Sequence, residues 1–158
     1  MNQWEQGTPD LQVARVDSAA CSIGDSILVF AGSNASSNYE FEADLSSVER
    51  LNVPAIASGR ANWELIKFPP YVFTPRCNPT VVPLNNNEVA ILGGRDDFSH
   101  FSDVLVFNVK KKKFHKVAYG GDYKFRSDGN QAALVGNKVV ALVLNVKKIA
   151  SLIEWTLG

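Results

Sequence analysis

The chain has 158 residues, the size of one ordinary domain, and 46% of them are hydrophobic and 20% charged. This composition is typical of a globular protein with a packed core. The 16 basic and 16 acidic residues balance, which excludes a global electrostatic field that would attract nucleic acid or an anionic membrane.

The chain shows no targeting or membrane-spanning signal. Residues 1–5, Met-Asn-Gln-Trp-Glu, lack the basic start and apolar centre of a secretory signal. The longest unbroken apolar run, residues 139–144, is far too short to span a bilayer. These features predict a cytoplasmic protein with no membrane or nucleic-acid partner. In that compartment Cys21 and Cys77 are predicted to be small buried thiols rather than a disulfide or a metal pair.

The pattern along the chain predicts an all-β fold. Short apolar runs rich in Val, Ile, Leu and Phe alternate with clusters of Gly, Asn, Ser, Pro and Asp, which indicates strands joined by turns. The predicted strands are residues 19–23, 26–31, 47–53, 62–67, 80–84, 88–92, 103–109, 113–117, 131–135, 138–144 and 150–157. The one helix candidate, residues 42–50, has an acidic start and a mixed pattern.

These strands fall into a repeat. Residues 76–92 align without a gap onto the stretch that begins at Arg126, with a shift of 50 residues (126 − 76). An earlier copy is more loosely spaced: residues 23–32 align onto residues 85–94, and residues 47–53 onto residues 103–109. A period of about 50 residues is that of one four-stranded unit.

The order of features within each copy resembles the kelch repeat. An apolar strand ends in Gly93-Gly94, a variable loop and a V-x-V-F-x-V strand follow, then a short turn and a strand led by the aromatic residue Phe114. Two departures from the family pattern are Ala31-Gly32 in the first copy and Val143-Leu144 in the third. The resemblance implies a kelch-type β-propeller of about three four-stranded blades.

Physical reasoning from the residues supports the same architecture. A four-stranded sheet with two apolar faces cannot bury itself and must stack on neighbouring sheets. Glycine after the second strand is expected to make room for a large ring of a neighbour, such as Trp63. The alternative is a two-sheet sandwich of unrelated short strands.

The chain is predicted to be a single kelch-repeat region, residues 1–158. Its parts are an outer strand of a blade at 1–14, a first repeat at 15–70, a second at 71–120 and a third at 121–158 that lacks its fourth strand. Propellers of this kind use about four to eight blades. Two alternatives stay open: the chain is a segment of a longer kelch propeller, or two copies form a homodimer that completes six blades, each lending its first strand to the other.

The residues give little indication of catalysis. His100 and His115 are the only histidines and have no metal-binding spacing. The basic run at residues 110–113 falls in a predicted turn and is interpreted as a solvated loop. We therefore predict no cofactor, no metal and no enzymatic activity. Alternatives are an enzyme or small-ligand binder that uses the propeller's channel mouth, and a purely structural subunit of a larger assembly.

The resemblance implies a recognition surface on one set of loops, residues 33–46, 69–78, 95–102 and 118–130. Aromatic and arginine side chains dominate protein interfaces. The candidate partner-binding residues are Tyr71, Phe73, Arg76, Arg95, Asp96, Phe98, Tyr123, Phe125 and Arg126.

The predicted function is a noncatalytic scaffold or adaptor that binds a protein or peptide. Its sharpest version is recognition of an acidic or phosphorylated peptide by Arg76, Arg95 and Arg126. Because Arg76 and Arg126 hold equivalent repeat positions, each has an alternative role as a brace within its own blade.

Overall fold

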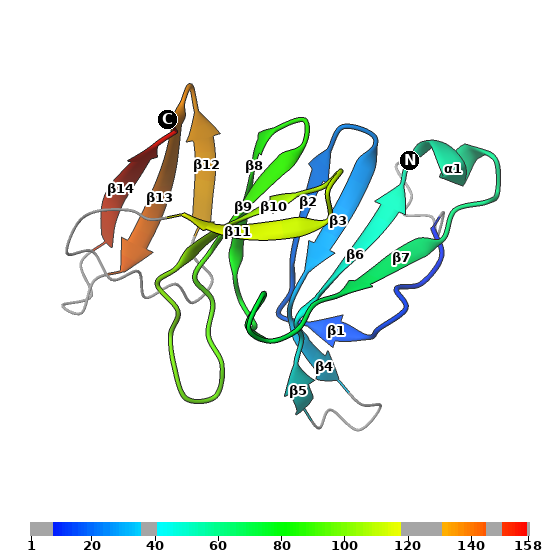
Figure 1. Cartoon of the computed structure of the whole chain (residues 1–158), viewed down its shortest axis with the longest axis horizontal. Helices are drawn as coiled ribbons and strands as arrows, with labels where there is room; N and C mark the ends of the chain where they lie inside the picture. The colour runs from blue at the N-terminus through cyan, green and yellow to red at the C-terminus, as the bar shows by residue number, and fades with distance from the viewer. Residues whose placement is uncertain (1–7, 36–40, 118–130, 145–149, 158) are drawn as a thin grey trace, which may run out of the picture.

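The computed structural model describes residues 8–35, 41–117, 131–144 and 150–157, and its fold is all-β with one short helix. Three antiparallel sheets stand side by side, and a smaller sheet lies at their lower end (Figure 1). Within the described ranges no helix has the length and apolar character needed to cross a membrane.

The three stacked sheets are simple meanders in which each strand pairs with the next one of its sheet. The first sheet contains β2 (Ala19–Ile23), β3 (Ser26–Phe30), β6 (Ser47–Asn52) and β7 (Trp63–Lys67). The second contains β8 (Thr80–Asn85), β9 (Glu88–Leu92), β10 (Val104–Asn108) and β11 (Lys113–Val117). The third contains β12 (Gln131–Val135), β13 (Lys138–Leu144) and β14 (Ala150–Thr156). All eleven strands predicted from the sequence are confirmed, with bounds that agree to within one residue.

The smaller sheet was not predicted. It has the strand order β1-β4-β5, formed by β1 (Arg15–Val16), β4 (Ser33–Ala35) and β5 (Phe41–Asp44). The one helix candidate of the sequence, residues 42–50, contains no helix: β5 and β6 occupy this stretch, and β6 confirms the strand predicted at residues 47–53. Pairing of β6 with β3 on one side and β7 on the other outweighs the local acidic pattern. The helix that does form is α1 (Pro54–Ala57), directly after β6.

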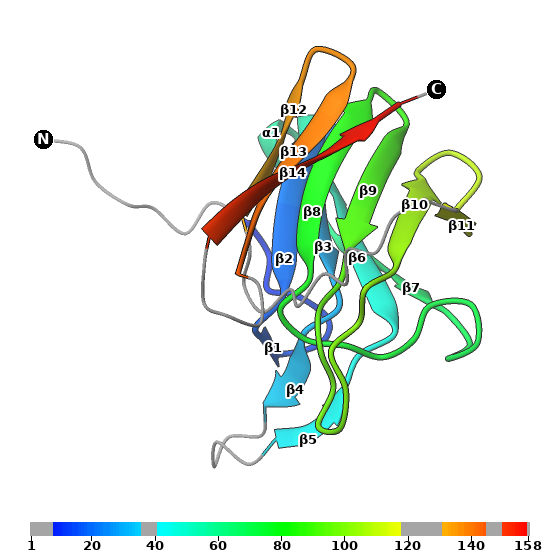
Figure 2. The ribbon, with the colours of Figure 1, turned by 90° about the vertical axis from the view of Figure 1, so that its left-hand side faces the viewer.

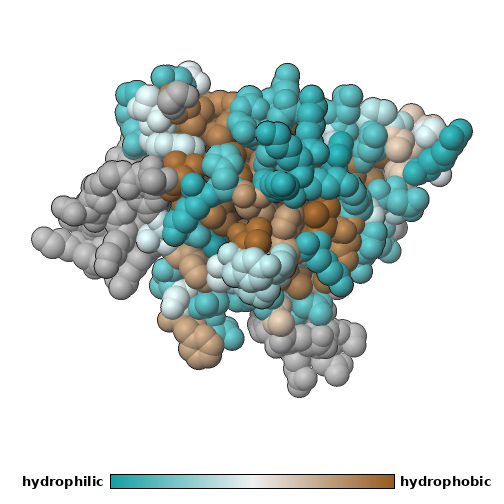
Figure 3. Space-filling model, viewed as in Figure 1, coloured by the Kyte–Doolittle hydropathy of each residue, from teal (hydrophilic) through white to brown (hydrophobic). Residues whose placement is uncertain are grey.

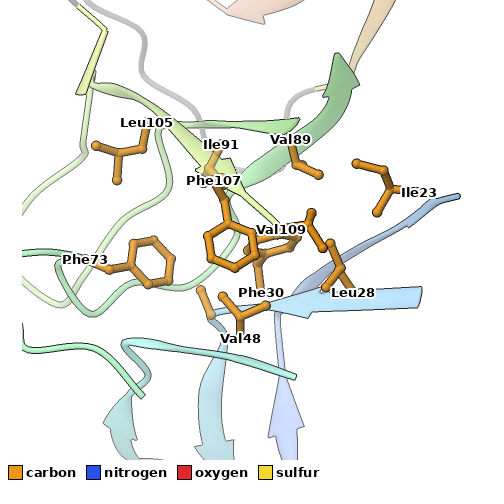
Figure 4. Packing of buried hydrophobic residues seen from close by; sticks show 11 residues of the cluster. Ile23, Leu28, Phe30, Val48, Phe73, Val89, Ile91, Leu105, Phe107 and Val109 are labelled. Atoms are coloured by element: carbon orange, nitrogen blue, oxygen red, sulfur yellow. The ribbon is translucent and has the colours of Figure 1, made fainter. Parts of the chain in front are cut away.

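The core lies in two layers between the stacked sheets. Between the first and second sheets, the rings of Phe30 and Phe107 meet edge to face with centroids 5.7 Å apart, among buried Leu28 and Val89 (Figure 4). The layer between the second and third sheets contains Val82, Ala90, Leu92, Val104, Val139 and Ala141. Strands β2, β8 and β12 contact one another along one side, and Figure 2 shows the second sheet extending from β8 through β9 and β10 to β11.

The second sheet is buried on both faces. Phe107 faces the first sheet, and Val104 faces the third. Successive residues of a strand point to opposite faces, so every residue from Val104 to Phe107 is buried. This double burial is why the sequence of β10 reads as a continuous apolar run rather than an alternating one.

The backbone confirms the alignment of Ala31-Gly32 with Gly93-Gly94. Gly32 and Gly94 follow β3 and β9 with φ of +91° and +96°. The preceding residues, Ala31 and Gly93, have φ of 57° and 59°. The chain therefore makes the same left-handed turn at both positions, although the first copy has an alanine in a region that favours glycine.

The two glycines make room for backbone and not for a large ring. A Cβ atom added at Gly32 would lie 2.6 Å from the carbonyl oxygen of Val16, and one at Gly94 would lie 2.8 Å from that of Cys77. Each carbonyl belongs to the segment just before the first strand of its own sheet: Val16 precedes β2, and Cys77 precedes β8. The expectation that this position accommodates a ring such as Trp63 is therefore wrong.

The N-terminal segment does not form the predicted strand in its described part. Residues 8–14 contain no strand, and they run along β7 at the outer face of the first sheet. The indole Nε1 of Trp63 donates a hydrogen bond of 2.9 Å to the carbonyl oxygen of Pro9. The side-chain amide of Gln12 donates in turn to the carbonyl oxygen of Trp63.

This segment corresponds to the connection that enters the second sheet. Residues 69–75 lead to Arg76 as residues 8–14 lead to Arg15. In the second sheet Phe73 of this connection stacks on Phe114, the residue that aligns with Trp63. We therefore interpret residues 8–14 as a connection between sheets rather than as an outer strand.

Candidate interaction site

Arg76 braces the second sheet from inside. Its fully buried guanidinium donates from Nη1 to the carbonyl oxygen of Gly93 (2.7 Å) and to Oδ1 of Asp103 (2.7 Å). Nη2 donates to Oδ2 of Asp103 (3.0 Å), which completes a two-pronged ion pair. The geometry supports the bracing role, and burial argues against the predicted contact of Arg76 with a partner.

Arg15 repeats this arrangement in the first sheet. Its Nη1 donates to the carbonyl oxygen of Ala31 (2.8 Å), and its Nη2 donates to Oε1 of Glu49 (2.6 Å). The Glu49 carboxylate also accepts hydrogen bonds from the backbone amides of Gln12 (2.7 Å) and Val13 (3.1 Å). Each buried arginine is therefore paired with a carboxylate, as a charge away from water requires. Nε of Arg15 is the one buried side-chain nitrogen or oxygen of the described residues that has no hydrogen-bond partner.

Phe73 also belongs to the core and not to the surface. Its ring stacks on Phe114 at a centroid distance of 4.4 Å and an interplanar angle of 19°. The guanidinium carbon of Arg76 lies 5.4 Å from the ring centroid of Phe73 and 4.4 Å from that of Phe101. The prediction that Phe73 contacts a partner is not supported by this packing.

The loop between β9 and β10 presents Phe98 to solvent. Oδ1 of Asp96 accepts hydrogen bonds from the backbone amides of Phe98 (2.9 Å) and Ser99 (2.6 Å), which fixes a tight turn at the tip. At the base, the amide of Phe101 donates to the carbonyl oxygen of Gly94 (2.8 Å). The Phe98 side chain is 95% exposed.

Tyr71 is the second exposed aromatic residue among the predicted ones. It is 88% exposed and lies in the connection from β7 to β8, where the amide of Val72 donates to the carbonyl oxygen of Pro69 (2.8 Å). This connection, the β9–β10 loop and the small sheet all lie in the lower part of Figure 1. We call the β7–β8 connection, the β9–β10 loop and the small sheet together the loop end.

A polar hollow of about 200 Å³ opens at the loop end. Its lining residues come from the small sheet, the segment before β8 and the β9–β10 loop: Asp17, Ser33, Ala43, Asp44, Cys77, Arg95 and Asp97. The backbones of Cys77 and Arg95 exchange two hydrogen bonds (2.8 and 2.9 Å), which bring Arg95 to the hollow. Three carboxylates and one guanidinium give the hollow an excess of negative charge.

The thiol of Cys77 lies at this hollow with only 3% of the residue exposed. Burial raises its pKa above the ordinary value of 9.0, and the nearby carboxylates of Asp44 and Asp17 raise it further, against the opposing effects of Arg95 and the Ser33 side chain. The Ser33 hydroxyl donates its hydrogen bond to Oδ1 of Asp44 (2.5 Å). The thiol is therefore neutral at physiological pH and a poor nucleophile. Both Cys21 and Cys77 are free, as predicted.

The structure brings together only part of the predicted set. Arg95, Asp96, Phe98 and Tyr71 lie at the loop end, whereas Tyr123, Phe125 and Arg126 lie outside the described residues.

Sequence reasoning missed the carboxylates of the hollow. Asp44 and Asp97 lie in the loops predicted to form the recognition surface, residues 33–46 and 95–102, but of the aspartates in these two loops only Asp96 is among the predicted site residues. The sequence does contain a signal for Asp17: it follows Arg15 by two residues, as Asn78 follows Arg76. In the structure both residues have a positive φ, 53° at Asp17 and 49° at Asn78. Asp and Asn tolerate this left-handed conformation better than most residues, so the pair marks equivalent turns before β2 and β8.

Two further hollows lie elsewhere. One of about 290 Å³ lies where β2, β8 and β12 begin, and its lining residues carry no charge: Ser18, Ala19, Ala20, Asn78, Pro79, Thr80, Val81, Gln131 and Ala132. The other, of about 260 Å³, lies between the second and third sheets beside Trp155. In the described part of the chain, no group of three or more His, Cys, Asp or Glu side chains is arranged to hold a metal ion.

Comparison with known proteins gives a fold and no family. No protein-family model matches the chain, and no curated protein matches it. The solved structure of YjhT is similar, with a TM-score of 0.65 over 87% of this chain and a sequence identity of 16%. The matched part is 36% of the YjhT chain, so this chain spans about a third of the length of that protein. At this identity the likeness concerns the fold alone.

Proposed function

We propose that the chain is a set of kelch-type propeller blades and that its loop end binds a segment of a partner protein. The repeated sheets support the first part. Each meander starts with an inner strand, β2, β8 or β12, and these strands lie next to one another. The equivalent arginine braces and left-handed turns of the first two sheets support a common ancestral unit.

The observation that carries the binding proposal is the exposure of Phe98 and Tyr71. Exposing a large aromatic ring to water is unfavourable, and such rings dominate the energy of protein interfaces when a partner covers them. Phe98 also sits on a turn whose backbone is held by Asp96. A preformed turn loses little conformational entropy on binding, which favours recognition.

The charge of the hollow indicates the chemistry of the partner. Arg95 is accompanied by Asp17, Asp44 and Asp97, and Arg76 is buried in its ion pair. Net negative charge repels the acidic or phosphorylated peptide suggested by the arginines alone and attracts lysine or arginine. The proposed partner segment therefore carries a basic side chain for the hollow and an apolar side chain for Phe98 or Tyr71.

Selection from a library of random peptides tests this proposal. The selected peptides should combine Lys or Arg with aromatic or aliphatic residues. They should bind Phe98→Ala and Asp97→Asn at least about tenfold more weakly than the unmodified protein. The matched control is Lys111→Ala in the exposed turn between β10 and β11, which should bind as the unmodified protein does. Failure of selection, enrichment of acidic peptides, or equal binding by all variants would contradict the proposal.

A further inference from the structure

The charged side chains of this neutral chain are unevenly distributed. Residues 110–116 carry five lysines of the 16 basic residues, whereas the hollow at the loop end carries three carboxylates. Strand β10 separates the two regions: it begins after the β9–β10 loop and ends at the turn before β11, about 17 Å away. The overall charge balance, on which the prediction of no nucleic-acid partner rests, therefore does not describe the surface around β11.

Four of these lysines have no ion pair with a residue of the described ranges. They are all exposed, and we call them the lysine strip: Lys110, Lys111, Lys113 and Lys116. The fifth, Lys112, forms an ion pair with Glu64 of β7. Figure 3 shows a hydrophilic area in the upper middle of the molecule, where Figure 1 draws the turn between β10 and β11.

The turn that carries Lys110 and Lys111 is held by the backbone. Oδ1 of Asn108 accepts a hydrogen bond from the amide of Lys111 (2.9 Å). The amide of Val109 donates to the carbonyl oxygen of Asn87 in the neighbouring β8–β9 turn (2.8 Å). Because the turn is fixed at both places, its two lysines can bind a partner without a loss of backbone entropy.

Strand β11 presents lysine on both of its faces. Phe114 packs against the core between the first and second sheets, and Lys116, two residues further on, lies on the same face of the strand. Lys113 lies on the opposite face, in a row with Asn108 and Glu88. The Glu88 backbone is two strand spacings, or about 10 Å, from that of Lys113. This is about one Debye length, so Glu88 offsets little of the positive charge of the lysine strip.

Protection of a strand edge explains only part of this arrangement. Lysine on an edge strand discourages pairing with another strand, and β11 is the edge of the second sheet among the described residues. Lys110 and Lys111 precede β11, so protection accounts for only two of the four lysines. Edge protection also produces no affinity for a polyanion, so the two roles predict different binding.

The composition of the lysine strip favours nucleic acid over a protein or a membrane. Protein interfaces are enriched in arginine and aromatic residues and depleted in lysine. The strip has no arginine, and the exposed large hydrophobic side chains of the described residues, such as Phe98 and Val135, lie in other segments. It therefore lacks the apolar side chains that insert into a bilayer beside basic ones. Lysine binds phosphate as a point charge, which suits a chain of repeated phosphates. We propose that the lysine strip binds the phosphate backbone of a nucleic acid without regard to base sequence.

The test is binding of the 158-residue chain to two short fluorescent duplex DNAs of unrelated sequence, measured by anisotropy at several salt concentrations. We expect equal affinities for the two duplexes. Four phosphate contacts predict a slope of about −3 to −4 for the logarithm of the binding constant against that of the salt concentration. Affinity should therefore fall by about a hundredfold between about 50 and 200 mM salt. Phe98→Ala should bind DNA as the unmodified protein does, so this proposal and peptide binding at the loop end fail separately.

Two variants of equal net charge separate the lysine strip from charge in general. Lys110→Gln combined with Lys113→Gln should weaken binding and make the slope shallower by about two. The matched control is Arg60→Gln combined with Lys138→Gln, which removes two positive charges from exposed positions outside the strip and should keep the slope. Absence of DNA binding at low salt, a preference for one duplex, or equal slopes of the two variants would overturn the inference. Binding to phosphatidylserine vesicles without binding to DNA would overturn it as well.

Discussion

Arg76 and Asp103 form a buried two-pronged ion pair, with Nη1–Oδ1 and Nη2–Oδ2 distances of 2.7 and 3.0 Å. The pair ties the segment before β8 to the residue before β10, so two parts of the second sheet that are distant in sequence become one unit. Arg15 and Glu49 form a related pair in the first sheet, at 2.6 Å. These two arginines act as structural braces, so a binding surface has to be formed by other residues.

Asp103→Ala should strongly destabilise the fold. It leaves the Arg76 guanidinium buried without its counter-ion, which costs about 3 kcal/mol or more in the free energy of unfolding. Urea denaturation followed by circular dichroism measures the loss. Lys138→Ala is the matched control, because it breaks an exposed ion pair with Glu154 and should cost less than about 1 kcal/mol. Equal effects of the two variants would rule out the bracing role.

Gly94→Ala should destabilise the protein more than Gly136→Ala. Both glycines have a positive φ, which costs an alanine about 1–2 kcal/mol. Only at Gly94 would the new Cβ also meet backbone, 2.8 Å from the carbonyl oxygen of Cys77, whereas nothing lies within 4 Å at Gly136. Thermal unfolding of the two variants should therefore give a lower midpoint for Gly94→Ala. Identical midpoints would mean that the close approach has no energetic weight.

Phe73→Ala and Phe98→Ala should have opposite consequences. Truncation of buried Phe73 removes its stacking on Phe114 and should cost about 3–5 kcal/mol of stability. Truncation of Phe98, which is exposed, should change stability by less than about 0.5 kcal/mol while it weakens peptide binding. Chemical denaturation of both variants, paired with a binding titration of Phe98→Ala, checks the assignment. A Phe73→Ala variant as stable as the unmodified protein would contradict the assignment of Phe73 to the core.

Cys21 should make stability depend on alkaline pH. Burial raises its pKa from 9.0 to about 11, so the unfolded chain releases this proton first as pH rises. The stability contribution is complete below pH 9 and is lost between pH 9 and 11, by at most about 3 kcal/mol. Cys21→Ala should lose less stability over this interval than the unmodified protein. Parallel pH profiles of the two proteins would contradict the assignment.

The strands could be predicted from the sequence because apolar runs and turn residues alternate along it. The local pattern was ambiguous at residues 42–50, where an acidic start offered a helix candidate beside the predicted strand 47–53; pairing of β6 with β3 and β7 decides for the strand. The pattern did not predict β1 and β4, which are too short to show an alternation of apolar and polar residues.

The candidate site was only partly predictable, because burial depends on where the chain returns. Arg76 and Phe98 both lie in predicted loops, yet one points into an ion pair beneath Phe101 and the other into solvent. The hollow is assembled from segments as distant as Asp17 and Asp97, whose proximity follows from the stacking of two sheets. No local sequence feature encodes that distance.

The most direct test of the proposed binding surface is a titration of a selected basic–apolar peptide by fluorescence anisotropy. The dissociation constant is measured at low and high salt for the unmodified protein, for Asp97→Asn with Phe98→Ala, and for the Lys111→Ala control. We predict that the double variant loses affinity by about a hundredfold, that salt weakens its binding less than that of the unmodified protein because it has one carboxylate fewer, and that the control binds as the unmodified protein does. Unchanged affinity of the double variant, or tighter binding when the basic residue of the peptide is replaced by Glu, would contradict a loop end that recognises a basic partner.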